Sequence, residues 1–537
     1  MDSNYVWLYD TTLRDGAQRE GIALSLEDKL KIIGRLDGLG VPFIEAGWPG
    51  ANPKDVQLFW HLKEVPPKNA QIVAFCSTRR PGRVAAEDKL LQAILAAGTH
   101  WVTLFGKSWD LHVTEGIKTT LDENLAMIHD SITYLRSQGR EVIYDAEHWF
   151  DGYKQNQGYA LKTLEVALDA GAEWLVFCDT NGGTLPHEIT KIVEDVVKAF
   201  GTGPRLGIHT HNDSGTAVAN AIAAVQSGVR MVQGTINGYG ERCGNANLCT
   251  LIPNLQLKLD YPCVAPEQLA ALAGISREVS EIVNLAPDDH APYVGRSAFA
   301  HKGGIHVSAV AKNPLTYEHI RPEQIGNLRR IVISDQSGLS NVLSKAKSFG
   351  LALDKTDLAC REILETLKQL ENDGYQFEAA EASFELLMRS ALGLRPQRFK
   401  LQEFQIHSVI SQGAAPKLYC NAIATIKIAV NGQERLEVAE GTGPVAALDR
   451  ALRKALVEFY PEISRFQLAD YKVRILDSES GTDAKIRVLI ESTNGDERWT
   501  TLGVSSNILK ASYLAVVEGI EYGLLLARKT SQPVAAL

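Results

Sequence analysis

Short apolar runs rich in β-forming residues alternate with amphipathic helical runs from residue 5 to about residue 260. The runs that have the length and composition of strands are 5–9, 43–47, 71–75, 101–105, 141–147, 173–179, 205–211 and 230–236. Between the first two, Ser25 is placed to cap a helix whose residues Ile33 and Leu36 share one face, and Gly40 is placed to end it. Strands that alternate with helices in this way predict a parallel sheet.

Eight β/α units within this length match a TIM barrel, which typically needs about 250 residues. A doubly wound sheet is the alternative, but neither GxGxxG nor GxxxxGK[ST] follows the first strand. The predicted fold class is therefore α/β: a TIM (β/α)8 barrel over 1–265, a mostly helical linker region over 266–395, and a duplicated α+β C-terminal domain over 396–537.

Charge and composition favour small molecules as partners. The 537-residue chain has a net charge of -9 and no long Lys/Arg run, which argues against nucleic acid or a membrane surface. It has no signal-peptide pattern and no apolar span of about 20 residues, so we expect a soluble, cytoplasmic protein. Its 7 cysteines never occur as CxxC, so neither a disulfide framework nor a structural zinc site is predicted.

The first strand leads into DTTLRDGAQREG, residues 10–21, which places Arg14 and Asp15 in one loop. An ion pair between these two side chains on a solvated loop is the alternative. In a TIM barrel, however, the loops after the strands form the active site. If this loop is catalytic, other strand ends should carry complementary chemistry.

The seventh predicted strand ends in HTHND, with His209 and His211 two residues apart. Alternate side chains on a strand point the same way, so both imidazoles can bind one ion. Asp15 supplies an anionic oxygen, and the mixed N/O set suits Mn, Co, Zn or Fe, or Mg with added waters.

The eighth predicted strand runs into NGYGERCGNAN, in which Asn245 offers a further carbonyl oxygen. Its glycines allow the backbone to approach the site closely, although a simple tight turn is the alternative. Three protein ligands and Asn245 would leave coordination positions open, as is typical of a catalytic metal.

LRDGAQ, LGIHTHNDSGTAVA and GERCGN resemble motifs of the isopropylmalate, homocitrate and citramalate synthase family. The resemblance implies an acyltransferase that carries out a metal-dependent, Claisen-type condensation of acetyl-CoA with a 2-oxo acid. It implies that Asp15, His209 and His211 bind a divalent metal ion such as Mn, Mg, Zn or Co, with Asn245 as a fourth ligand or close to the ion.

The same resemblance implies roles for further strand ends. Arg14 would bind substrate and stabilise the developing oxyanion, and Thr180 in DTNGG would hold the substrate carboxylate, unless it only caps the next turn. Glu147 in YDAEHW matches the family's acidic residue, with Asp145 as a neighbouring candidate. His112 departs by one residue from the family spacing, so its role stays open.

Residues 266–395 contain a glycine-punctuated piece, HKGGIH, followed closely by Tyr317. The resemblance places His306 and Tyr317 in the family's enolisation group, carried on the linker and reaching into the barrel mouth. A histidine with a near-neutral pKa is a suitable base for the α-proton of a thioester. The role of His301 stays open.

The C-terminal part contains an internal repeat, in which Asn431-Gly432 aligns with Asn494-Gly495 and a Glu-Arg pair follows each. Each copy predicts a hairpin with an Asn-Gly turn and then a helix, a ββα unit that must pack on its twin. The repeat resembles the family's regulatory domain, which implies a homodimer and feedback by a branched-chain amino acid, with isoleucine expected. A purely architectural dimer domain is the alternative.

The remaining question is which 2-oxo acid condenses with acetyl-CoA. Bulky strand ends, TLFGKSW and VIYDAEH, would crowd the pocket toward a methyl group, and GWPGANPKD and DAEHWFDGYK are most similar to family members that accept pyruvate. We therefore expect pyruvate and acetyl-CoA to give citramalate and CoA, on a route to isoleucine. The alternatives are 2-isopropylmalate synthesis, a metal-dependent acyl-CoA lyase and a non-catalytic amino-acid sensor.

Overall fold

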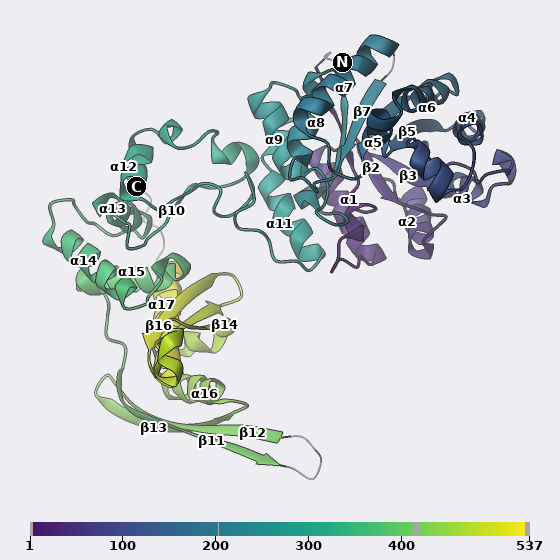
Figure 1. Ribbon diagram of the computed structural model, residues 1–537. Helices are drawn as coiled ribbons and strands as arrows, with labels where there is room; N and C mark the ends of the chain where they lie inside the picture. Colours follow the sequence, from purple (N-terminus) through teal and green to yellow (C-terminus); the bar gives the residue numbers. More distant parts are fainter. Residues whose placement is uncertain (1–3, 202, 204, 413–417, 532–537) are drawn as a thin grey trace. The chain divides into compact units, whose positions relative to one another are not determined.

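The structure is a computed structural model that describes residues 4–201, 203, 205–412 and 418–531. It divides into two compact units (Figure 1). The first runs to Phe299 and includes Glu318–Arg329; the second comprises Ala300–Tyr317 and the chain from Arg330 onward. None of the helices in the described part of the chain has the length and apolar character needed to cross a membrane.

The first unit contains a closed barrel of parallel strands in sequence order, with the first strand paired to the eighth. All eight predicted strands are present: β1 (Trp7–Asp10), β2 (Phe43–Gly47), β3 (Gln71–Ser77), β4 (Trp101–Lys107), β5 (Glu141–Glu147), β6 (Trp174–Asp179), β7 (Arg205–Thr210) and β8 (Met231–Gly234). The predicted TIM barrel is therefore confirmed.

Helices surround these strands, as Figure 1 shows. They are α1 (Leu26–Leu39), α2 (Pro53–Glu64), α3 (Lys89–Ala97), α4 (Leu121–Ser137), α5 (Trp149–Gln155), α6 (Gln157–Asp169), α7 (Pro186–Phe200), α8 (Ala217–Gln226) and α9 (Leu248–Lys258). Ser25 caps α1 by accepting the Asp28 amide, and Gly40 ends α1 with a φ of 83°, both as the sequence predicts. One core fills the barrel interior, and a second core lies between the strands and the helices.

Residues 266–395, predicted as one linker region, are divided between the two units. Helices α10 (Pro266–Leu269) and α11 (Leu272–Ile282) belong to the first unit. Residues 318–329 return to that unit because Ile325 is fully buried there and the Asn327 amide donates to the carbonyls of Tyr293 and Gly295.

The second unit begins with two short paired strands and four helices: β9 (Ala300–His301), β10 (Arg330–Ile331), α12 (Gly304–Lys312), α13 (Leu339–Ser348), α14 (Leu358–Asn372) and α15 (Glu381–Ala391). Two similar sheets follow. The first has β11 (Lys400–Gln412), β12 (Leu418–Val430), β13 (Gln433–Gly441) and helix α16 (Pro444–Leu456); the second has β14 (Gln467–Ile475), β15 (Ile486–Thr493), β16 (Arg498–Ser505) and α17 (Ile508–Ser531).

Each repeat therefore has three strands before its helix, where the sequence predicts two. The extra strands, β11 and β14, carry mostly exposed side chains where these are described, so their apolar pattern is weak. The predicted turn between β12 and β13 is present: Asn431 and Gly432 have φ values of 51° and 80°, as a two-residue type I′ turn requires.

Candidate active site

The loop after β1 is tied down by Asp10, which has a structural role. Its carboxylate accepts hydrogen bonds from the backbone amide and hydroxyl of Thr12, at 2.9 and 2.8 Å. The Thr12 hydroxyl in turn accepts the amide of Ile236, in the loop after β8. The first and last barrel strands are thereby joined at the loop that carries Arg14 and Asp15.

Arg14 is held by two carboxylates at the mouth of the barrel. Its Nε donates to Glu45 Oε1 at 2.6 Å, and its Nη1 donates to Asp15 Oδ2 at 3.0 Å. Its guanidinium carbon lies 3.9 Å from the ring centre of Phe75, a cation–π contact. Arg14 and Asp15 do pair with each other, but as part of a larger buried network rather than on a solvated loop.

Glu45 is a site residue that the sequence reasoning missed. It is fully buried on β2, where the hydroxyls of Tyr9 and Thr11 and the Arg14 guanidinium all donate to its carboxylate at 2.6 Å. A buried carboxylate needs such compensation, and here it fixes the direction of Arg14. The available signal was a charged residue inside the apolar strand FIEAG.

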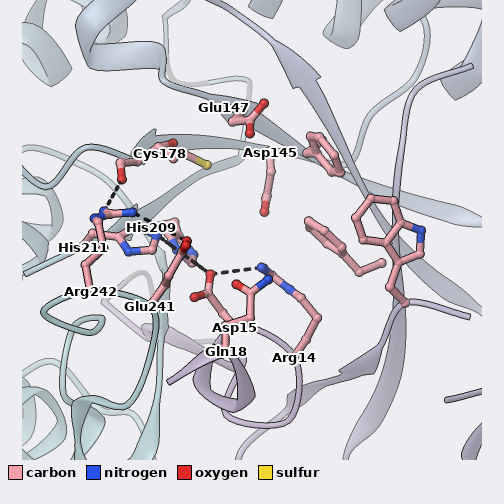
Figure 2. A pocket seen from close by; sticks show the side chains of 14 residues that line it. Arg14, Asp15, Gln18, Asp145, Glu147, Cys178, His209, His211, Glu241 and Arg242 are labelled. Atoms are coloured by element: carbon pink, nitrogen blue, oxygen red, sulfur yellow. Dashed lines mark hydrogen bonds and ion pairs between the residues drawn. The ribbon is translucent and has the colours of Figure 1, made fainter. Parts of the chain in front are cut away.

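Asp15, His209 and His211 lie together at the ends of β1 and β7. The two Nε2 atoms are 3.3 Å apart, and Asp15 Oδ2 is 3.5 Å from His209 Nε2 and 3.8 Å from His211 Nε2. Ligands of one tetrahedral or octahedral ion are about 3 to 3.5 Å apart. These residues form the one such cluster of potential metal ligands among the described residues (Figure 2).

The electrostatics of the cluster suit a cation. Burial would raise the pKa of Asp15, but the charge of Arg14 and a hydrogen bond with His209 hold that pKa well below its usual value. Burial, reinforced by the neighbouring His209, lowers the pKa of His211 to about 4. A neutral imidazole beside a carboxylate is the form that binds a metal.

Asn245 supplies a further indication that an ion fits here. Its amide nitrogen donates to Asp15 Oδ1 at 2.9 Å, while its buried Oδ1 has no hydrogen-bond partner among the described residues. A buried acceptor without a partner is costly, and a cation would satisfy it. The close approach depends on Gly240, because a Cβ there would lie 2.3 Å from the Asn245 nitrogen.

Other strand ends complete one pocket at the barrel mouth. Thr180 and Glu147, both singled out from the sequence, line it together with the metal-ligand candidates, and Asp145 points into it (Figure 2). Glu147 forms an ion pair with Lys107. The Thr180 hydroxyl accepts the backbone amide of His148 at 2.9 Å.

Aromatic rings form one side of this pocket. Phe75 and Phe105 stack with ring centres 5.1 Å apart, and Trp48 meets both edge-on at 5.6 Å. Phe105, in the strand end TLFGKSW, lines the pocket together with Phe75 on β3 and Trp48 just after β2. His112, whose role the sequence left open, packs against both Trp109 and His148, which also contact each other.

His306 and Tyr317 lie in the second unit, where their rings stack with centres 4.2 Å apart. His306 is exposed in the first turn of α12, and Tyr317 is 46% exposed. The structure thus brings these two residues together as a pair, on the segment that the sequence singled out.

Family models match most of the chain. An HMGL-like model matches residues 5–275, which contain the barrel and the pocket. A homocitrate synthase post-HMGL domain-like model matches residues 293–374. A LeuA allosteric (dimerisation) domain model matches residues 378–524, which contain the repeat.

Individual relatives match over nearly the full length. An (R)-citramalate synthase of Synechocystis sp. is 70% identical over 97% of this chain and 96% of that protein. An (R)-citramalate synthase of Aquifex aeolicus is 52% identical over 97% of this chain and 98% of its own length. A probable 2-isopropylmalate synthase of Methanopyrus kandleri is 30% identical over 96% of this chain and 97% of its own length. The chain therefore belongs to the HMGL-like family, and within it to the isopropylmalate, homocitrate and citramalate synthases.

Proposed function

We propose that the chain is an (R)-citramalate synthase, which condenses acetyl-CoA with pyruvate to give citramalate and CoA. The observation that carries the proposal is the Asp15, His209 and His211 cluster beside Arg14, in a chain 70% identical to an (R)-citramalate synthase. The less supported alternative, 2-isopropylmalate synthesis, would use the same ligands with a larger acceptor.

The chemistry is addition of a thioester carbanion to a ketone, followed by hydrolysis of the thioester. A divalent ion held by Asp15, His209 and His211 would polarise the ketone carbonyl of the 2-oxo acid. The N–H groups of Arg14 stabilise the alkoxide that forms when carbon attacks this carbonyl. Because Glu45 and Asp15 already orient Arg14, little reorganisation is needed in the transition state.

Thr180 is suited to hold the carboxylate of the oxo acid. Its oxygen accepts the His148 amide, so the hydroxyl hydrogen remains able to donate to a substrate in the pocket. Glu147, on the strand end next to it, and the His306–Tyr317 pair are the proposed groups for proton transfer from the methyl group of acetyl-CoA.

Two imidazoles and one carboxylate suit Mn²⁺, Co²⁺ or Zn²⁺, and Mg²⁺ if waters complete its shell. We propose one of these ions as the cofactor. Restoring the metal-stripped protein with each ion in turn, at equal free concentration, and measuring the rate identifies the best one.

The test of the proposed reaction is the initial rate of CoA release with a panel of 2-oxo acids. We expect the highest kcat/KM with pyruvate, a lower value with 2-oxobutanoate and a still lower value with 3-methyl-2-oxobutanoate. A preference for 3-methyl-2-oxobutanoate would favour 2-isopropylmalate synthesis instead. CoA release with none of the acids would leave the acyl-CoA lyase and the amino-acid sensor as the surviving hypotheses.

Replacing Phe105 should change which 2-oxo acid is preferred. Phe105→Ala removes a half-buried ring that lines the pocket and stacks on Phe75. Room for one or two more methyl groups changes the difference in transition-state binding free energy between the two acids by about 1 to 3 kcal/mol. We therefore expect the ratio of kcat/KM for 2-oxobutanoate to kcat/KM for pyruvate to rise about tenfold or more. Competition between the two acids measures the ratio. Phe105→Tyr keeps the bulk and should keep the preference; an unchanged ratio in Phe105→Ala would remove Phe105 from specificity.

We further propose that the C-terminal repeat forms a homodimer and binds isoleucine as an inhibitor. The match of residues 378–524 to a LeuA allosteric (dimerisation) domain supports this proposal. A coupling of roughly 1 to 3 kcal/mol would lower activity 5- to 150-fold at saturation. Dose-response curves for isoleucine, leucine and valine on the intact protein test it. A flat response to all three would leave the repeat as dimer architecture, and a response to leucine alone would favour the 2-isopropylmalate reaction.

A further inference from the structure

Gln233 lies inside the barrel and contacts both His209, a candidate metal ligand, and Asp145, a buried acid. It lies on β8 directly opposite His209 in the strand register, and it is 1% exposed. Its Oε1 is 2.8 Å from His209 Nδ1, and its Nε2 donates to Asp145 Oδ1 at 2.9 Å. The sequence reasoning left Gln233 unassigned, although it lies in the predicted eighth strand.

The two ends of the amide fix the direction of these hydrogen bonds. The carboxylate of Asp145 takes the NH₂ end, so the carbonyl end is left to accept a hydrogen from His209 Nδ1. With its hydrogen on Nδ1, the neutral imidazole has a free electron pair on Nε2, the atom that faces Asp15 Oδ2 and His211.

We propose that Gln233 is a positioning residue that holds His209 in the tautomer and orientation required for metal binding. This role rests on the proposed metal site, because Gln233 would act on metal binding through one of its ligands, His209. The other histidine lacks such support: His211 Nδ1 is buried without a hydrogen-bond partner among the described residues. The Gln233 amide thus orients the His209 imidazole from the side opposite the proposed metal, as groups bonded to metal-bound histidines do.

The test is Mn²⁺ binding by calorimetry to the metal-stripped full-length protein, in two variants of Gln233. Gln233→Met has nearly the same shape but accepts no comparable hydrogen bond, so we expect Mn²⁺ to bind 10- to 100-fold more weakly. Gln233→Glu keeps an acceptor for His209 Nδ1–H, and we expect Mn²⁺ affinity within about threefold of the starting protein. The Gln233 amide nitrogen lies 2.9 Å from Asp145 Oδ1, so the two carboxyl groups that face each other in this variant would share one proton.

Asn220→Leu is the matched control, because Asn220 is a fully buried amide on α8 that donates to the Thr184 carbonyl. It should lower the melting temperature without changing Mn²⁺ affinity. Unchanged affinity in Gln233→Met, or equal losses in both Gln233 variants, would overturn the positioning role. Unchanged Mn²⁺ affinity in His209→Ala would instead show that the proposed metal site is wrong, which distinguishes the two failures.

Discussion

Asp15→Asn and His209→Ala should each lower kcat/KM by about a thousandfold or more and reduce the amount of bound metal. Each change removes one ligand of the proposed site, and a metal that stabilises the developing charge is worth several kcal/mol, of which about 4 kcal/mol corresponds to a thousandfold. The fold should remain intact, because both residues lie at the face formed by the loops that follow the strands. In TIM barrels it is the opposite face whose residues contribute mainly to stability. Elemental analysis of the purified variants and steady-state rates with pyruvate measure the two effects.

His129→Ala is a matched control, since His129 is a half-exposed histidine on α4, outside the pocket-lining residues. It should leave both metal content and rate unchanged. If Asp15→Asn and His209→Ala both kept full metal occupancy, Asp15 and His209 would not be metal ligands, whatever the rates of the two variants. A lower melting temperature together with metal loss would point to unfolding, so thermal melts accompany the measurement.

The barrel could be predicted because its strands and helices have distinct local patterns. Buried parallel strands are almost continuously apolar, as β2 and β6 are, and the helices between them carry their own caps. The outer strands β11 and β14 lack such a pattern, because their described side chains are mostly exposed. Their presence is set by pairing with β12 and β15, which is a tertiary interaction.

The candidate ligands were found because each belongs to a compact motif at a strand end. Asp15 follows Arg14 in one loop, and His209 and His211 share one side of a strand. Glu45 and Gln233 are single polar residues inside apolar strands, a signal that marks each as unusual but does not show which residue it contacts. Their roles become visible only when pairing of neighbouring strands brings Glu45 to Arg14 and Gln233 to His209.

His306→Asn should stop the exchange of acetyl-CoA methyl protons with solvent and lower the condensation rate 10²- to 10⁴-fold, the usual contribution of a general base. Asparagine keeps a polar side chain of similar reach but cannot take up a proton near neutral pH. Because the proposed base acts on the thioester carbon, binding of pyruvate to the metal-loaded protein should change by less than about threefold. Deuterium uptake from D₂O, followed by NMR, measures exchange, and calorimetry measures pyruvate binding.

This result would separate the two halves of the reaction, since Asp15→Asn should weaken pyruvate binding whereas His306→Asn should not. His306 is exposed in the second unit, so its replacement should cost little stability and a loss of exchange would report on chemistry. His290→Asn, at an exposed position of the first unit, is the matched control. Condensation within about tenfold of the starting protein would contradict a general base at His306 and leave Glu147 and Asp145 as the candidates in the barrel pocket.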